Sequence, residues 1–217
     1  MELFSNQSAI EFPAGLTEKY RPSALSEFIG LDKAKKIGAK LIASPFNSAW
    51  LFNGPSGTGK TSFALALAQL MPAELHHVPS QNCNLEMIER LSRTCNYVPM
   101  QGKKCHLILV DEADQMTPAA QISLLSKLDS TSPLPNTIWI FTCNSIDRFE
   151  ARFLSRLKQI EFSSYGISGE TAGLLQSIWD KESPAGAEMP DFARIVKDSK
   201  NNVRAALQAL ETALLLA

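Results

Sequence analysis

The 217-residue chain has no excess of basic charge, no closely spaced cysteines and no long apolar run. Lysine and arginine together number 21 and aspartate and glutamate 22, so no global basic surface for nucleic acid is predicted, and any such contact needs a local patch. The four cysteines contain no Cys-x-x-Cys pair, so neither a zinc site nor a disulfide framework is expected, and free thiols fit a reducing cytoplasm. His76 and His77 are neighbours on a predicted strand, so they face opposite sides and are interpreted as structural or solvent-facing. The apolar runs are shorter than a membrane span and no charged leader opens the chain, so we expect a cytoplasmic protein without membrane contact.

Residues 54–61 form a glycine-rich stretch, GPSGTGKT, with the spacing of a phosphate-binding loop. Its fixed positions are Gly54, Gly59, Lys60 and Thr61, which should coincide by chance in about one chain of this length in a hundred. An apolar stretch precedes the loop and a helical pattern follows it, as the motif requires. We expect inward-turned N–H groups to bind phosphate, Lys60 to reach the β- and γ-phosphates, and Thr61 to bind Mg²⁺. The predicted nucleotide-binding residues are Gly54, Pro55, Ser56, Gly57, Thr58, Gly59, Lys60, Thr61 and Ser62.

A continuous apolar run over residues 105–110 predicts a buried parallel strand, and it ends in Asp111-Glu112-Ala113-Asp114. Doubly wound α/β proteins bind their ligands at the carboxyl ends of such strands. We expect Asp111 to hold Mg²⁺ and Glu112 to orient and polarise the water that attacks the γ-phosphate. Asp114 is explained as well by the dipole of a following helix.

Asn144 follows a second apolar strand, predicted over residues 137–141, just as Asp111 follows the first. Its amide suits a hydrogen bond to the γ-phosphate or to the attacking water, although asparagine is also a common turn residue. Arg148, Arg152 and Arg156 recur every four residues and would share one face of a helix, for which a solvated basic surface is the default interpretation. Arg204, near the start of the last predicted helix, has a surface position as its simplest explanation.

Apolar periodicity predicts an α/β chain with two parts. Strands are expected at 49–52, 74–78, 105–110, 137–141 and 160–162, with helices at 31–42, 63–68, 85–91 and from 117 between them. Only helices are expected after residue 163, at 169–180, 190–198 and 202–215. The prediction is a three-layer P-loop core with a central parallel sheet over residues 1–163, followed by a small α-helical lid domain over 164–217 that closes over the nucleotide. Residues 1–16 are expected to form a loosely attached arm.

Taken together, these motifs resemble those of the AAA+ ATPases, and most closely the clamp-loader branch, to which the small subunits of replication factor C belong. The resemblance covers the chain from residue 16 onward and implies ATP as the nucleotide, Mg²⁺ as its metal, and ATP hydrolysis. It rests on the order of Glu18-Lys19-Tyr20-Arg21-Pro22, the loop at 54–61, Asp111-Glu112-Ala113-Asp114, Asn144, Ser155-Arg156 and Asn202-Val203-Arg204.

Carried over residue by residue, the resemblance implies a segment around adenine made of Tyr20, Arg21, Pro22, Ile29 and Gly30. It makes Asn144 the first sensor and Arg204 the second-sensor arginine of the lid. Arg156 matches the arginine finger that acts on ATP bound to a neighbouring subunit, so the site would be shared within a homo- or hetero-oligomer. The implied catalytic set is Lys60, Glu112, Asn144, Arg156 and Arg204, and the implied partners are DNA or a DNA-bound protein such as a sliding clamp or a helicase.

The sequence departs from the clamp-loader pattern in three places. Leu157 stands where the finger motif has cysteine, which keeps Arg152 as a second candidate finger. Leu125 and Ser126 stand where replication factor C subunits usually carry two arginines. The helical collar domain that closes clamp-loader rings does not follow the lid in this sequence, which leaves three alternatives: assembly through the ATPase modules alone, reliance on partners, or a chain that is a fragment.

The leading hypothesis is an ATP-hydrolysing switch or motor of clamp-loader type, acting as an oligomer in DNA replication or DNA processing. A helicase loader, a branch-migration motor or a protein-remodelling ATPase is the alternative that the missing collar favours. A nucleotide-dependent scaffold subunit with negligible hydrolysis is a further alternative, against which Glu112 and Asn144 count.

Overall fold

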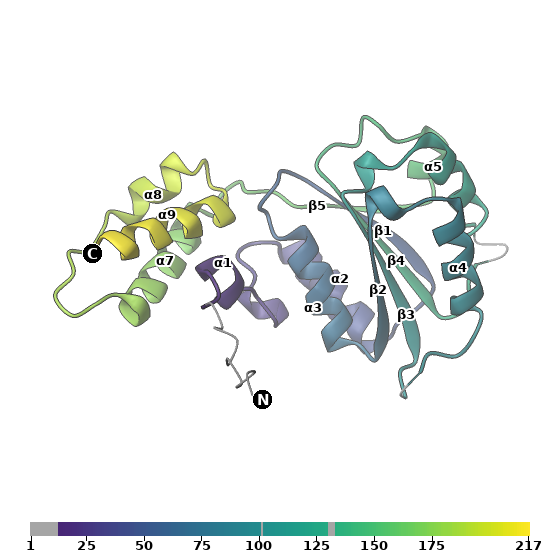
Figure 1. The fold of residues 1–217 in the computed structure, drawn as a ribbon, viewed down its shortest axis with the longest axis horizontal. Helices are drawn as coiled ribbons and strands as arrows, with labels where there is room; N and C mark the ends of the chain where they lie inside the picture. The colour runs from purple at the N-terminus through teal and green to yellow at the C-terminus, as the bar shows by residue number, and fades with distance from the viewer. Residues whose placement is uncertain (1–12, 101, 130–132) are drawn as a thin grey trace, which may run out of the picture.

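The computed structural model describes residues 13–100, 102–129 and 133–217. Most of the arm predicted at residues 1–16, and the start of the loop predicted after residue 130, lie outside the described residues. Within them, five strands form one sheet in which every neighbouring pair is parallel, in the order β2-β3-β4-β1-β5 (Figure 1). The strands are β1 (Ser48–Asn53), β2 (Ala73–Pro79), β3 (Cys105–Asp111), β4 (Thr137–Cys143) and β5 (Lys158–Glu161).

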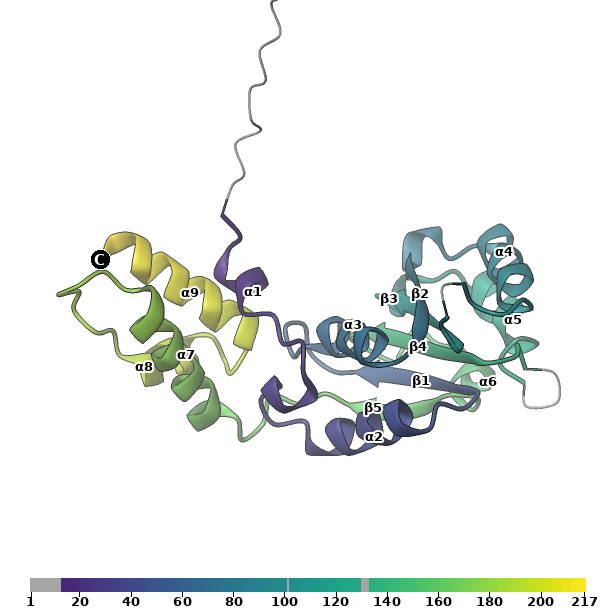
Figure 2. The same cartoon turned by 90° about the horizontal axis from the view of Figure 1, so that it is seen from below.

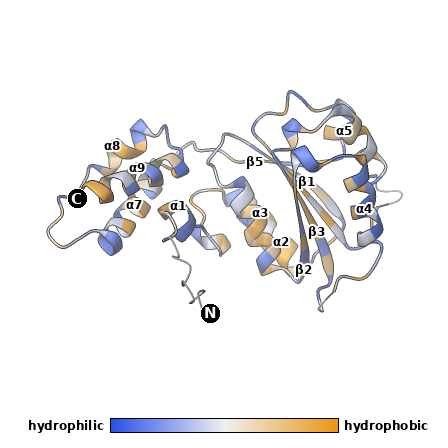
Figure 3. Ribbon diagram, in the orientation of Figure 1, coloured by the Kyte–Doolittle hydropathy of each residue, from blue (hydrophilic) through white to orange (hydrophobic). Residues whose placement is uncertain are grey.

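Helices cover both faces of the sheet and complete the three layers that the sequence predicts. One face carries α2 (Asp32–Ala43) and α3 (Lys60–Leu70), and the other carries α4 (Leu85–Cys95), α5 (Pro118–Leu125) and α6 (Ala151–Leu154). Alternate residues of each strand serve the two faces: Leu107 and Leu109 of β3 pack towards α3, whereas Ile108 and Val110 pack towards α4 and α5. Hydrophobic residues accordingly concentrate on α2 and α3 in Figure 3. The predicted α/β core with a central parallel sheet is confirmed.

The C-terminal part is helical, as predicted, and consists of α7 (Ser168–Glu182), α8 (Phe192–Asp198) and α9 (Val203–Leu216). These helices enclose a core of their own that includes Leu175, Ile178 and Leu210. The short helix α1 (Leu16–Lys19) lies against α9 in Figure 2, with Leu16 in that core. The N–H of Leu16 also donates to a carboxylate oxygen of Glu211 at 2.9 Å. The expectation of a loose arm is therefore wrong at Leu16, because a four-residue helix is too short to show a period in the sequence.

The segment after β4 is not the continuous helix that a shared face of the three arginines requires. Only residues 151–154 form a helix, and Arg148 lies in a turn before it, so Arg148, Arg152 and Arg156 do not line one continuous helical face. Three short 3-10 helices complete the described structure, at Leu25–Glu27, Ser80–Asn82 and Ala113–Gln115. All four cysteines are free and buried, as expected. None of the helices in the described ranges is both long and apolar enough to cross a membrane.

Candidate nucleotide site

The glycine-rich loop joins the carboxyl end of β1 to the start of α3 at the edge of the sheet. Gly54, Gly57 and Gly59 have φ angles of 150°, 77° and 88°, which residues with a side chain rarely adopt. A Cβ atom on Gly54 would lie 2.1 Å from the carbonyl oxygen of Phe162, so the residue that follows β5 leaves no room for a side chain. Gly59 is the residue before α3, and the first N–H groups of that helix are available to an anion.

Lys60 is the first residue of α3, and its ammonium group lies under the loop. The Nζ atom donates to the carbonyl oxygens of Gly54 (2.7 Å) and Pro55 (2.8 Å) and to the amide oxygen of Asn144 (3.1 Å). The side chain is buried, and this burial, reinforced by the positive charge of Arg204, lowers the pKa of Lys60. The phosphate-loop lysine and the polar residue after β4, 84 positions apart in sequence, therefore meet at one point.

Asp111 ends β3 within hydrogen-bonding distance of the hydroxyl of Thr61. Thr61 Oγ1 donates to Asp111 Oδ1 at 2.7 Å, and the hydroxyl of Thr142 on β4 donates to the same oxygen. His77 Nε2 lies 3.9 Å from the other carboxylate oxygen. A threonine hydroxyl and a carboxylate side by side are the hard oxygen donors that Mg²⁺ prefers, so the residues present fit this ion.

Glu112 and Asn144 lie next to this pair, in a cavity of about 180 Å³ that the phosphate loop also lines. Glu112 is exposed and has a left-handed backbone with φ 55°, held by a hydrogen bond of 3.0 Å from its N–H to the hydroxyl of Thr142. A non-glycine residue in this conformation is uncommon and is enriched at functional sites. Cys143 lines the same cavity, and burial raises its pKa to about 12, so its thiol stays protonated near neutral pH.

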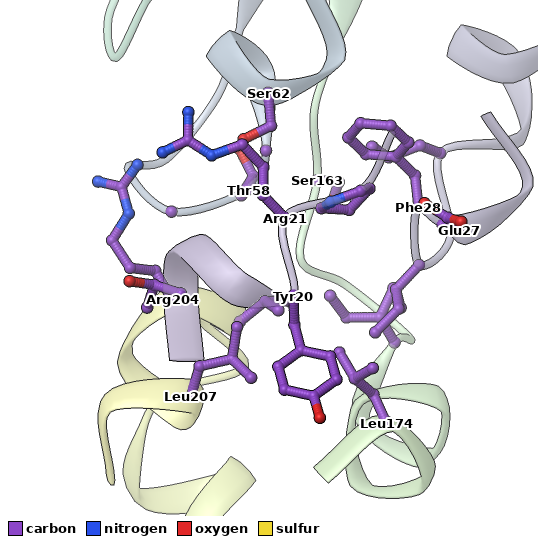
Figure 4. A pocket seen from close by; sticks show the side chains of 18 residues that line it. Tyr20, Arg21, Glu27, Phe28, Thr58, Ser62, Ser163, Leu174, Arg204 and Leu207 are labelled. Carbon is purple, nitrogen blue, oxygen red and sulfur yellow. The ribbon is translucent and has the colours of Figure 1, made fainter. Parts of the chain in front are cut away.

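A second cavity, of about 260 Å³, adjoins the phosphate cavity and lies between the core, the α1 segment and the lid (Figure 4). Its walls combine apolar and polar side chains, and the apolar part suits a planar base. Leu174 and Leu207 come from the lid, and Phe28 from the segment before α2. Of the residues expected around adenine, the cavity is lined by Tyr20, Arg21, Pro22 and Ile29. Gly30 does not line it, and its N–H instead donates to Glu170 of α7 at 3.0 Å.

Arg21 and Arg204 line both cavities and bring two positive charges to their junction. Figure 4 shows both side chains extending to the same side of the pocket, near Thr58 and Ser62. Arg204 follows Val203, the first residue of α9, so the lid contributes this charge. With Lys60, these two arginines give the phosphate cavity three cationic side chains, which come from three separate segments. Such a set matches the charge of a triphosphate.

Asn202, the N-cap of α9, connects the lid directly to the phosphate loop. Its side-chain oxygen accepts from the N–H of Ala205 at 3.1 Å and so caps the helix. Its amide nitrogen donates to the carbonyl oxygen of Ser56 at 2.9 Å. Because Arg204 lies two residues further along, this contact positions the lid arginine over the loop.

Arg156 lies at the other end of the sheet. It shares a cavity with Ser48 and Thr137, the first residues of β1 and β4, whereas the phosphate loop follows the last residue of β1. Six residues of strand separate the two ends by about 17 Å. Arg156 pairs with Asp129 at 3.5 Å and donates to the carbonyl oxygen of Arg152 at 2.9 Å, while the side chain of Arg152 is exposed.

Several residues of the site did not stand out in the sequence. Thr142 and His77 have no motif, and they enter the site because parallel strands end together beside Asp111. Phe28 was not singled out in the sequence, and Asn202 appeared only as part of the motif that contains Arg204. Arg21 was assigned to the base, but it also lines the phosphate cavity.

Residues 50–165 match the AAA family, described as the ATPase family associated with various cellular activities. A replication factor C small subunit 1 from Pyrobaculum arsenaticum is 30% identical over 205 residues, which cover 90% of this chain and 60% of that protein. Replication factor C subunit 4 from Homo sapiens is 28% identical over 216 residues, which cover 93% of this chain and 58% of that protein. The chain thus spans about 60% of the length of these relatives.

Among solved structures, the Thermotoga maritima RuvB Holliday junction branch migration motor is similar in fold, with a TM-score of 0.66 and 23% identity over 88% of this chain and 64% of that chain. A point mutant of Thermotoga maritima RuvB gives a TM-score of 0.69 with 19% identity, covering 89% of this chain and 65% of that chain. The family match includes the phosphate loop, the acidic strand end and Asn144. The chain belongs to the AAA family of ATPases, and its relatives include small subunits of replication factor C.

Proposed function

We propose that this protein is an ATP-hydrolysing switch subunit of clamp-loader type that works in an oligomer during DNA replication or DNA processing. The observation that carries the proposal is the pairing of a nearly complete triphosphate site with an arginine at the far end of the sheet. The site joins Lys60, the Thr61–Asp111 pair and Arg204 around one cavity. Arg156 cannot reach it within one chain.

Each residue has a distinct task in the proposed hydrolysis. The loop N–H groups and Lys60 bind the β- and γ-phosphates. Thr61 and Asp111 hold Mg²⁺, which offsets negative charge on the phosphate oxygens. Glu112 accepts a proton from the attacking water and Asn144 orients that water, since both reach the cavity from neighbouring strand ends.

The lid couples the nucleotide to the shape of the protein. Arg204 enters the phosphate cavity from α9, and Leu174 and Leu207 of the lid form one side of the base cavity. ATP bound between the two parts therefore favours a closed arrangement, and loss of the γ-phosphate weakens the contact with Arg204. We propose the core and the lid, predicted at residues 1–163 and 164–217, as the two moving units, with α1 moving with the lid into whose core Leu16 packs.

The arginine finger is proposed to act on the neighbouring subunit. A heterologous contact, in which the carboxyl ends of one sheet face the amino ends of the next, brings Arg156 to ATP on the neighbour. The names of the relatives, replication factor C small subunits, support DNA replication as the setting and a clamp or DNA as the partner.

A mixing experiment tests the shared site. Glu112→Gln should bind ATP and hydrolyse it at least about a hundredfold more slowly, the upper part of the usual contribution of a general base. Arg156→Ala should also be slow, because its neighbour lacks a finger. In a 1:1 mixture the steady-state rate should recover to about one quarter of wild type, since random assembly places two intact halves at one interface in four.

Arg152→Ala in place of Arg156→Ala decides between the two candidate fingers. Arg194→Ala, which removes an exposed lid arginine paired with Asp198, is the matched control and should keep the wild-type rate. The rate per subunit should also rise with protein concentration and rise further with primer-template DNA. A rate that does not change when DNA is added would indicate that the target is a protein. No recovery of activity at any mixing ratio would contradict the shared site.

A further inference from the structure

Three metal-binding side chains lie together on the face of the sheet that α4 covers, away from α3 and the phosphate loop. His76 of β2, His106 of β3 and Cys95, the last residue of α4, each offer one ligand atom within 4.8 Å of the other two. His76 Nε2 and His106 Nδ1 are 3.0 Å apart. The three residues are too far apart in the sequence to form a recognisable metal-binding motif. The expectation that the chain has no zinc site was based on the spacing of the cysteines alone.

Strand register explains how the group forms. In β2, Glu74 and His76 point to the same face because they are two residues apart, and Glu74 lies directly opposite His106 in β3. The carboxylate of Glu74 comes within 3.6 Å of His106 Nδ1. Adjacent His77 points to the other face, where it approaches Asp111.

His106 is oriented as a metal-ligating histidine is, with its other ring nitrogen on a carbonyl oxygen. His106 is buried, with 1% of its surface exposed, and its Nε2–H donates to the carbonyl oxygen of Tyr97 at 3.0 Å. This bond fixes the tautomer, so the lone pair of Nδ1 points towards His76 and Glu74.

We propose that His76, Cys95 and His106 bind one zinc ion, with the carboxylate of Glu74 as the fourth ligand. A tetrahedral zinc ion with bonds of about 2.0–2.3 Å keeps its nitrogen and sulfur ligands about 3.3–3.6 Å apart, which the observed separations reach by small movements. Nitrogen and thiol ligands favour zinc over magnesium or calcium, which take oxygen ligands. The ion displaces the proton of the Cys95 thiol, and a proton is released to water.

The site has a structural role that does not depend on ATP hydrolysis. It links the end of α4 to β2, the edge strand, and to β3. The same residues hold the segment after α4: Tyr97 accepts from His106, and the N–H of Met100 donates to Glu74 at 3.3 Å. Tyr97, Val98 and Met100 are largely exposed, so the zinc ion fixes the position of an apolar surface segment.

Metal content and cobalt spectra of the full chain test the proposal. Protein prepared without chelators, in excess Mg²⁺ so that the nucleotide site does not take up zinc, should contain one zinc per chain. Co²⁺ in its place should give a thiolate-to-cobalt charge-transfer absorption. His76→Ala and Cys95→Ala should weaken zinc binding at least about a hundredfold, because loss of an outer partner alone costs 10–100-fold. His76 is only partly buried, so its variant remains informative if Cys95→Ala fails to fold.

A neighbour that faces the other side of the sheet is the matched control. Cys105→Ala should keep the zinc content and the cobalt spectrum of the wild type. Zinc should also raise the unfolding temperature of the wild type and of this control, and leave that of His76→Ala unchanged. Substoichiometric zinc, a cobalt spectrum without the thiolate band, or equal binding by His76→Ala would overturn the proposal and leave a histidine hydrogen bond in its place.

Discussion

Replacing Gly57 by alanine should disconnect the lid from the phosphate loop. Gly57 has φ 77°, and a Cβ atom there would lie 2.1 Å from the side-chain oxygen of Asn202. Asn202 must therefore move, and it loses its bond to Ser56 and its cap on α9. Gly166 has nearly the same φ, 76°, but a Cβ atom on it would meet nothing within 4 Å, so Gly166→Ala carries the backbone strain alone.

The expected difference follows from these contacts. Left-handed strain costs about 1–2 kcal/mol in both variants. Gly57→Ala adds about 1 kcal/mol for the lost cap and about 1 kcal/mol for the lost hydrogen bond. If this additional destabilisation of about 2 kcal/mol acts on the closed form that binds ATP, the Kd for ATP rises about 30-fold in Gly57→Ala. The Kd stays near wild type in Gly166→Ala.

Fluorescent-nucleotide titration measures the Kd, and urea unfolding measures the free energy of unfolding. Asn202→Ala separates the lid contact from the loop, because it removes both bonds of Asn202 and leaves the glycine in place. Its control is Asn84→Ala, which removes the cap of α4 (2.9 Å to the N–H of Met87) at a residue that lines neither cavity. Equal ATP affinity in Gly57→Ala and Gly166→Ala, with Asn202→Ala as tight as wild type, would refute the proposed connection.

Two further substitutions test the metal position and the lid core. Thr61→Val keeps the volume and removes the hydroxyl bound to Asp111, so the affinity for Mg²⁺·ATP should fall about tenfold or more while affinity for ATP without Mg²⁺ stays near wild type. Calorimetric titration with and without Mg²⁺ checks this, and a Mg²⁺-independent loss would contradict it. Leu175→Ala removes a fully buried side chain from the lid core and should lower the free energy of unfolding by about 2–5 kcal/mol in urea denaturation. A loss well below 1 kcal/mol would show that the lid does not unfold cooperatively with the core.

Much of the nucleotide site could be predicted from short stretches of the sequence. The loop at 54–61 is continuous in sequence, and its glycines are needed by the backbone itself, so its position could be predicted without neighbours. Asp111 and Glu112 were predictable because an apolar run long enough for one buried strand places them at its carboxyl end. The order of the five strands in the sheet could not be predicted, because five parallel strands can be arranged in several ways with the same apolar pattern.

Contacts between segments that are far apart in the sequence could not be predicted from the apolar periodicity. Leu16 joins the lid core although it lies near the start of the chain, because only packing of α1 on α9 brings it there. Gly30 was expected beside the base, but its N–H is used by Glu170, a residue 140 positions away. The spacing of the three arginines would give a shared face only in a continuous helix, and only one helical turn forms between Arg148 and Arg156.

The sequence by itself determined the chemistry of the loop, the strands that support it and the helical character of the C-terminal part, because these depend on backbone conformation and on neighbours a few residues apart. Only the tertiary structure decided which side chains meet. It placed Asn202 on Ser56, Arg21 in the phosphate cavity, and His76 beside His106. Strand register and helix packing set these contacts, and both arise from burial across the whole chain rather than from any short segment.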